Sequence, residues 1–303
     1  MPAMVLGAHL KAERGPRTQA QVVAEAGKLV SKSVYSRLEG GEVRVDKPRT
    51  MPALLKALGV PEGPRHDELV ALAFAASKEG WASKFRSGHR EAVPDSMLRL
   101  TSLEQSATEQ FVVDCNTIPG QLQTRAYCRL VTARTLSASL RDAGMEGVVA
   151  GVRDERSRRF AERLVTDRPT ARFFIAQSAL YAHFGQPEVL IEQLQVLLDL
   201  ADARDLPVGI RVITSKHPLA VPVNTLVRLG FAKSKYPVPD VIYNEVGWQA
   251  FFHRGPLTGI EEVTDPNYVD LDDLVDNVLM RAPGYRASRR LIEDALLSAQ
   301  LRL

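Results

Sequence analysis

Glycine and proline divide the first 80 residues into short segments, and this division restricts what that part of the chain can form. Gly15-Pro16 ends the first segment, and Gly40-Gly41 ends the third. Thr18 and Ser31 stand directly before the second and third segments, where helix N-caps are expected. Apolar residues recur at helical spacing within each segment, and two more amphipathic segments follow before residue 80. The pattern therefore predicts a compact all-helical unit over residues 1–80.

The third of these segments, VSKSVYSRLEGGE, carries an unusual outer face for a short helix. Tyr35 and Leu38 are spaced to point inward, whereas small polar and basic side chains occupy the amino end. In a helix-turn-helix, the third helix presents its amino end to the major groove, and such side chains reach base edges and phosphates. We therefore predict a helix-turn-helix DNA-binding domain at residues 1–80.

Length and composition set wider limits. A chain of 303 residues is long enough for about two domains. No apolar run approaches the roughly 18 residues of a membrane span, and the first residues lack the pattern of a secretion signal, so we expect a cytoplasmic protein with no membrane partner. Cys115 and Cys128 match no redox or zinc spacing and are expected to be reduced thiols.

The distribution of charge is more informative than the net charge of +3. Residues 1–50 hold nine Lys/Arg against five Asp/Glu, a net charge of +4, so the remainder carries −1. A basic amino-terminal unit on a near-neutral body is typical of a DNA-binding head, although a solvated surface has the same composition.

The rest of the chain changes character along its length. Residues 81–114 are polar and mixed, and we expect a linker or connecting segment there. Strand signals begin after Pro169, with one long helix between the first two strands and another that closes the chain. The predicted fold class is an all-α helix-turn-helix domain followed by an α+β domain, residues 115–303, with a mostly antiparallel sheet. The alternating charges of GVRDERSRRFAERLV predict a salt-bridged, solvated helix face.

The amino-terminal segments resemble the Cro/CI-type (XRE) repressors. The resemblance rests on Thr18-Gln19, the Val22-Val23 pair and VSKSVYSRLEGGE, with a turn two residues longer than the family pattern. It implies that Glu39 is structural and that Tyr35 and Leu38 are buried. The residues expected to contact DNA are Arg17, Gln19, Ser31, Lys32, Ser33, Val34, Arg37 and Arg44.

The segment DCNTIPGQLQTRAYCRLV resembles a domain of unknown function that follows XRE heads in actinobacterial regulators. Pro119, Gly120, Leu122, Gln123, Thr124 and Tyr127 carry this likeness. The resemblance implies an antitoxin-like transcriptional regulator, often paired with a small partner protein encoded nearby. The loops YAHF and HPLAVPVNT depart from the family pattern, which predicts a different ligand if those loops border a pocket.

The carboxy-terminal histidines suggest one further site. Strand ends bring several polar and aromatic residues toward one cleft, which would bind a small molecule. These candidates are Tyr181, His183, Phe184, His217, Tyr243, Glu245, Trp248 and His253. Their spacing matches no metal motif, and no nucleophile elbow or glycine-rich phosphate loop accompanies them, so we expect no metal, no cofactor and no catalysis.

These patterns predict a homodimeric transcriptional regulator that binds double-stranded DNA through its head and senses a ligand or partner through its second domain. The alternative is an enzyme or small-molecule-binding protein built on the same scaffold, with a head that no longer reads DNA. Salt-dependent binding to an operator distinguishes the two.

Overall fold

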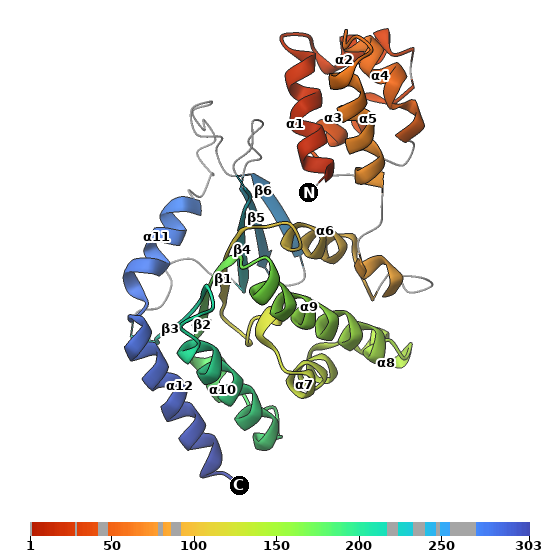
Figure 1. Ribbon diagram of the computed structural model, residues 1–303. Helices are drawn as coiled ribbons and strands as arrows, with labels where there is room; N and C mark the ends of the chain where they lie inside the picture. Colours follow the sequence, from red (N-terminus) through yellow and green to blue (C-terminus); the bar gives the residue numbers. More distant parts are fainter. Residues whose placement is uncertain are drawn as a thin grey trace. The chain divides into compact units, whose positions relative to one another are not determined.

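The computed structural model in Figure 1 describes residues 2–27, 29–41, 48–77, 81–85, 92–216, 224–232, 240–246, 249–254 and 271–303. The chain forms two compact units. One is built on residues 1–80, and the other on residues 81–231 and 239–303. Three residues predicted to contact DNA or ligand, Arg44, His217 and Trp248, lie outside the described residues.

The first unit is all-helical, as its sequence predicts. The glycine and proline positions separate its elements, and Thr18 and Ser31 are N-caps as expected. The elements are α1 (Pro2–Arg14), α2 (Gln19–Glu25), α3 (Lys32–Glu39), the 3₁₀ turn η1 (Pro48–Thr50), α4 (Met51–Ala57) and α5 (Pro64–Ser77).

One hydrophobic core joins these helices. Tyr35 and Leu38 of α3 are buried in it, as the resemblance implies, together with Leu6 and Leu10 of α1 and Leu69 of α5. The two aliphatic side chains of α1 are one turn apart, so they project from one face of the helix. Helix α3 is therefore fixed from the inside, and its opposite face is left for other contacts.

The second unit contains one mixed sheet, which has six strands among the described residues, in the order β3-β2-β1-β4-β5-β6. The first three strands are parallel to one another, and the remaining pairings are antiparallel. The strands are β1 (Glu109–Asp114), β2 (Thr170–Ala176), β3 (Val208–Ile213), β4 (Thr225–Gly230), β5 (Val241–Val246) and β6 (Gln249–Arg254). The predicted α+β class is confirmed, and the sheet is mixed rather than mostly antiparallel because helical crossovers join β1 to β2 and β2 to β3.

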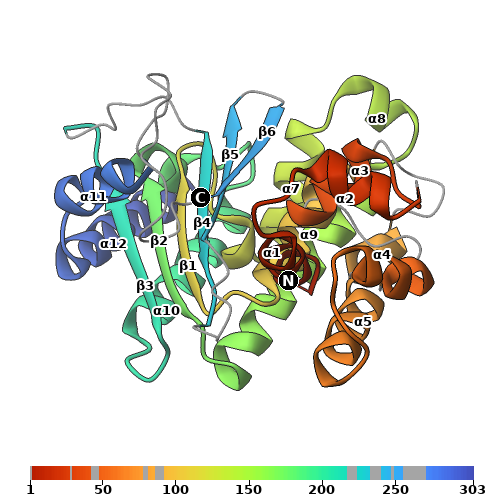
Figure 2. The same ribbon diagram turned by 90° about the horizontal axis from the view of Figure 1, so that it is seen from above.

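Helices cover both faces of this sheet (Figure 2). On one face, α11 packs its Val275 and Val278 against Phe111, Phe174 and other apolar side chains of the strands. On the other face, Phe160 of α9 meets Phe173 of β2 edge to face, with ring centroids 5.5 Å apart. The helices and turns of this unit are η2 (Trp81–Phe85), α6 (Asp95–Glu104), η3 (Gly120–Leu122), α7 (Arg125–Thr135), α8 (Ala138–Asp142), α9 (Glu146–Thr166), η4 (Gln177–Tyr181), α10 (Pro187–Asp202), α11 (Leu271–Arg281) and α12 (Tyr285–Gln300).

Strand β1 is the main difference from the sequence-based expectation, which places the first strand after Pro169. It lies between β2 and β4 in the middle of the sheet, and five of its six residues are buried. Residues 81–114, expected to connect the two domains, contain η2 and α6 as well as this strand. Strand β1 begins with two polar residues, Glu109 and Gln110, so the short apolar run that follows does not predict a strand from the sequence alone.

The close approach of α1 to α3 gives a first prediction. A Cβ atom on Gly7 would lie 2.5 Å from the carbonyl oxygens of Leu38 and Glu39. We expect Gly7→Ala to lower the free energy of unfolding of the helical unit by about 1–3 kcal/mol, because the two helices must separate. Urea denaturation followed by circular dichroism measures it.

The matched control is Gly147→Ala in α9, where no atom lies within 4 Å of the new Cβ. Its stability should be unchanged or higher by about 0.5–1 kcal/mol. A Gly7→Ala protein as stable as this control would contradict the packing described here.

Candidate nucleic-acid interface

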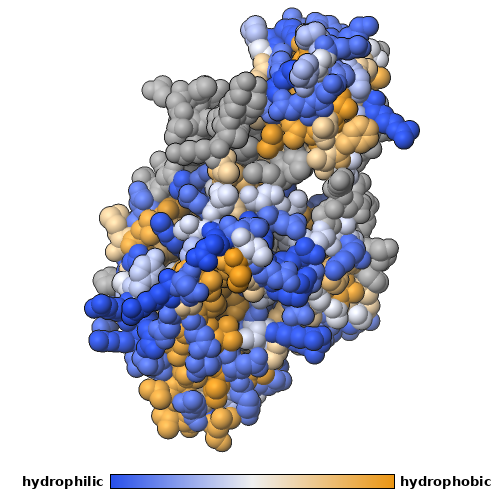
Figure 3. Space-filling view, viewed as in Figure 1, coloured by the Kyte–Doolittle hydropathy of each residue, from blue (hydrophilic) through white to orange (hydrophobic). Residues whose placement is uncertain are grey.

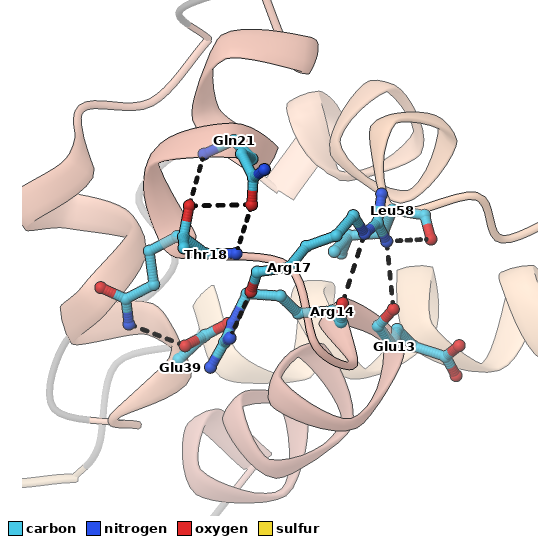
Figure 4. A network of polar contacts seen from close by, with 8 residues as sticks. Glu13, Arg14, Arg17, Thr18, Gln21, Glu39 and Leu58 are labelled. Atoms are coloured by element: carbon cyan, nitrogen blue, oxygen red, sulfur yellow. Dashed lines mark hydrogen bonds and ion pairs between the residues drawn. The ribbon is translucent and has the colours of Figure 1, made fainter.

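The amino end of α3 is held by its own cap. The Ser31 hydroxyl accepts a hydrogen bond from the backbone N–H of Val34 at 3.2 Å. Helix α2 begins with a capping box, in which Thr18 and Gln21 each bind the backbone N–H of the other (Figure 4). Both helices of the motif therefore start at defined residues, and the first turn of α3 is preorganised.

A buried carboxylate ties α1, α2 and α3 together. Glu39, at the last position of α3, is 5% exposed. It accepts hydrogen bonds from Arg14 Nε at 2.6 Å and from the Gln19 side-chain amide at 2.8 Å (Figure 4). The bond to Glu39 raises the pKa of Arg14 above its usual value, so the guanidinium stays charged. Glu39 is structural in this arrangement, and it fixes α3 relative to both preceding helices.

Arg17 uses its guanidinium inside the same unit. It donates to the carbonyl oxygens of Glu13 and Leu58 at 3.2 and 2.8 Å (Figure 4). It also donates to the carbonyl oxygen of Ala57 at 2.9 Å. It also pairs with Glu25 at 3.0 Å. Carbonyl groups at the ends of helices lack partners within the helix, and Arg17 satisfies those at the ends of α1 and α4. Arg17, which the sequence predicts to contact DNA, thus fixes the segment that leads into the helix-turn-helix.

The outer face of α3, in contrast to Glu39 and Arg17, carries exposed polar and basic side chains. Lys32, Ser33, Ser36 and Arg37 are exposed. In the part of the chain that the structure describes, neither Lys32 nor Arg37 forms an ion pair or a side-chain hydrogen bond. Val34 is half-buried and packs against the core of the unit. Two cations and two hydroxyls therefore remain for an external partner.

The turn between α2 and α3 contains Gly27 in the left-handed region, with φ of +62°. Its N–H donates to the carbonyl of Ala24 at 3.1 Å, which closes the end of α2. Leu29 follows and is 46% exposed. The turn thus contains a glycine in a conformation that is unfavourable for other residues.

In the second unit, the segment TIPGQLQT is fastened by polar side chains. The side-chain amide of Gln123 donates to the carbonyl of Ile118 at 2.7 Å, and the Ser157 hydroxyl of α9 donates to the Gln123 carbonyl at 2.8 Å. Gln193 of α10 accepts from the Thr124 N–H and donates to the Leu122 carbonyl. This segment anchors α7, α9 and α10 to one another.

Comparison with known families agrees with this division. Residues 5–69 match the family described as "Helix-turn-helix domain". Residues 97–294 match "Domain of unknown function (DUF5753)", which covers more than half of the chain. The protein belongs to the DUF5753 family. The chain matches no curated protein and no solved structure.

The predicted ligand-binding residues of the DUF5753 domain lie in several separate places. Tyr243 donates a hydrogen bond to Glu245 within β5 at 3.0 Å. Tyr181 and His183 instead line a small pocket between η4, α10 and α12. Phe184 packs edge to face on Tyr127, with ring centroids 6.2 Å apart. The backbone of His253 pairs with Ile242 in the sheet, and its side chain lies outside the described residues.

Helix α9 of the DUF5753 domain is only partly the solvated face that its charge pattern predicts. Arg158 is exposed and pairs with Glu155 and Glu162, as expected. Arg156, by contrast, points inward and forms a bidentate pair with Glu104, whose side chain is 8% exposed. Alternation of charge along a sequence does not distinguish an arginine on a solvated face from one that is paired inside.

Within the described residues, no helix is long and apolar enough to span a membrane, and no group of three His, Cys, Asp or Glu residues could hold a metal ion. Both cysteines are free thiols, and burial raises the pKa of each to about 11, which makes them poor nucleophiles.

The Glu39 network gives a second prediction. We expect Glu39→Gln to lower the free energy of unfolding of the helical unit by about 2–4 kcal/mol, because it leaves Arg14 partly buried without its anion. Glu25→Gln should change it by less than about 1 kcal/mol, since that carboxylate is half-exposed. Urea denaturation of both variants provides the comparison. Equal effects would show that the buried carboxylate does not organise the unit.

Proposed function

We propose that the protein is a sequence-specific DNA-binding transcriptional regulator of the Cro/CI (XRE) type. The observation that carries this proposal is the outer face of α3, where Lys32 and Arg37 are exposed and have no partner within the described residues. A helix with a fixed amino end and two uncompensated cations suits the major groove, where the phosphates of both strands attract positive charge.

Six of the eight predicted DNA contacts have distinct roles in this proposal. Lys32, Ser33 and Arg37 face the DNA directly. Ser31 caps α3 and so fixes the start of that helix. Arg17 and Gln19 act indirectly, because their side chains bind Glu39 and the ends of α1 and α4. Figure 3 shows hydrophilic residues over much of the visible surface of the helical unit, together with a hydrophobic patch.

We further propose that the protein acts in the cytoplasm as a homodimer, in the manner of antitoxin-like actinobacterial regulators, and that the DUF5753 domain pairs the two copies and receives a signal. A two-fold dimer would read half-sites one helical turn apart, roughly 34 Å, on a near-palindromic operator. The exposed Leu297, Leu301 and Leu303 at the end of α12 support an association role for this domain. A small partner protein, in place of a second copy of the chain, is the alternative occupant of this apolar surface.

The first experiment identifies the DNA. Full-length protein is used to pull down fragments of the genome that encodes it, and the enriched fragments are sequenced. The proposal expects a shared, near-palindromic motif, including one upstream of the gene itself. Recovery of fragments with no common motif would favour a head that no longer reads DNA.

The α3 face gives a third prediction. On an enriched fragment, we expect Lys32→Gln and Arg37→Gln each to weaken binding and to reduce the slope of log affinity against log salt by about 0.9 for every phosphate that the variant no longer neutralises. Fluorescence anisotropy across a salt series measures both quantities. Neither substitution should change thermal stability, because neither side chain has an intramolecular partner among the described residues.

The control is Lys11→Gln, which removes one exposed positive charge from α1 of the same unit. Its salt slope should equal that of the unchanged protein. If all three variants weaken binding equally, the effect is one of net charge, and α3 is not the reading helix.

A further inference from the structure

Helix α12 of the DUF5753 domain has a buried side and an exposed apolar side. The helix packs against α10 and β3, and the buried side consists of Ser288, Ile292, Ala295, Leu296 and Ala299. Leu297 and Leu301 lie outside this contact and are 56% and 88% exposed. In Figure 3, hydrophobic residues gather at the end of this unit where Figure 1 shows the end of α12. An exposed apolar surface of this kind marks a site of association.

A charged row runs beside these leucines. Asp294, Ser298 and Arg302 follow one another at intervals of four residues, so they lie on one side of the helix. The helical winding extends as far as this row, because the N–H of Leu301 donates to the carbonyl of Leu297 at 3.1 Å. Asp294 and Arg302 are exposed, and Ser298 is half-buried between them.

The two charges of this row form no ion pair within the part of the chain that the structure describes. Arg289 of the same helix, by contrast, pairs with Asp202 and Glu293. Asp294 and Arg302 cannot pair with each other, because eight residues of helix separate them by about 12 Å. Each charge therefore remains available to a group from another molecule.

The order of these charges matches its own reverse. In a two-fold pair of antiparallel α12 helices centred on Ser298, residues equally far from Ser298 in opposite directions lie opposite each other. Asp294 then faces Arg302 of the second copy, and the same pair forms again on the other side of the axis. A parallel pair would instead place Asp294 against Asp294 and Arg302 against Arg302, which like-charge repulsion disfavours.

The leucines match under the same symmetry. A two-fold axis that lies across both helices keeps the leucine row of each copy on the same side of the contact. Leu297 then lies within about 3 Å, along the helix axis, of Leu301 of the second copy. Four leucines would leave water together, beside two ion pairs that fix the direction of the helices.

We propose that α12 is the surface through which two copies of this chain associate, as an antiparallel helix pair with Ser298 at the two-fold axis. Burial of Leu297 and Leu301 drives the association, and the pairs between Asp294 and Arg302 set its register. The match of the row to its own reverse favours a second copy over a small partner protein, because only an isologous contact requires it.

This inference rests on the homodimer proposed above and names its contact surface, and its test needs no DNA. A protein that binds its operator but dimerises through another surface would overturn the α12 contact alone. A protein that dimerises through α12 but binds no DNA would overturn the DNA-binding proposal alone.

Sedimentation equilibrium of the full-length protein over a concentration series measures the association. We expect a reversible dimer, and we expect Asp294→Arg and Arg302→Asp each to weaken it at least about tenfold, because each places like charges together at two positions. The control is Asp142→Arg, which makes the same change of charge at an exposed position of α8, away from α12 in Figures 1 and 2. It should leave the dimer unchanged.

Rescue identifies the pair. The double variant that combines Asp294→Arg with Arg302→Asp exchanges both charges, so it should dimerise within about threefold of the unchanged protein. An equimolar mixture of the two single variants should also associate, because each copy supplies the charges that the other lacks. Each variant should keep the circular dichroism spectrum of the unchanged protein, since neither side chain has an intramolecular partner among the described residues.

The apolar part of the surface is tested separately. We expect Leu297→Ser to weaken the dimer at least about tenfold. The control Val165→Ser, at a side chain of α9 that is 67% exposed, should not. The proposal is overturned if the unchanged protein is monomeric at every concentration, if the single charge variants dimerise as it does, or if neither the double variant nor the mixture recovers association.

Discussion

The ion pair between Glu39 and Arg14, with the Gln19 amide as its third member, determines how the head presents α3. The carboxylate is nearly inaccessible to water, so its charge must be matched inside the protein. Because its two partners come from α1 and α2, satisfying one charge also fixes three helices. The exposed residues of α3 therefore need no internal contacts of their own, and Lys32 and Arg37 remain open to an anionic partner.

Local signals made the helical unit predictable from sequence. Thr18 and Ser31 are N-caps, and glycines end the segments between them, so the helix limits follow from short-range chemistry. Strand β1 could not be found in the same way. Its polar first residues, Glu109 and Gln110, resemble a loop, and only pairing with β2 and β4 makes the segment a strand. Such pairing is not visible in a local pattern.

The candidate sites show the same limit. Sequence identifies which residue types occupy the recognition helix, but it cannot show that Arg17 and Gln19 already have internal partners while Lys32 has none among the described residues. Arg156 illustrates the converse. Its charge lies in an alternating run that is typical of a solvated helix, and only the folded structure shows that it points inward and pairs with the buried carboxylate of Glu104. The number of partners that a charge has is a property of the fold.

Methylation interference measures whether α3 enters the major groove, as we propose. Dimethyl sulfate methylates guanine N7, an acceptor exposed in the major groove. We expect methylated guanines within two half-sites, one helical turn apart, to block binding of the full-length protein. Binding that tolerates every N7 methyl group would show that α3 does not enter the major groove.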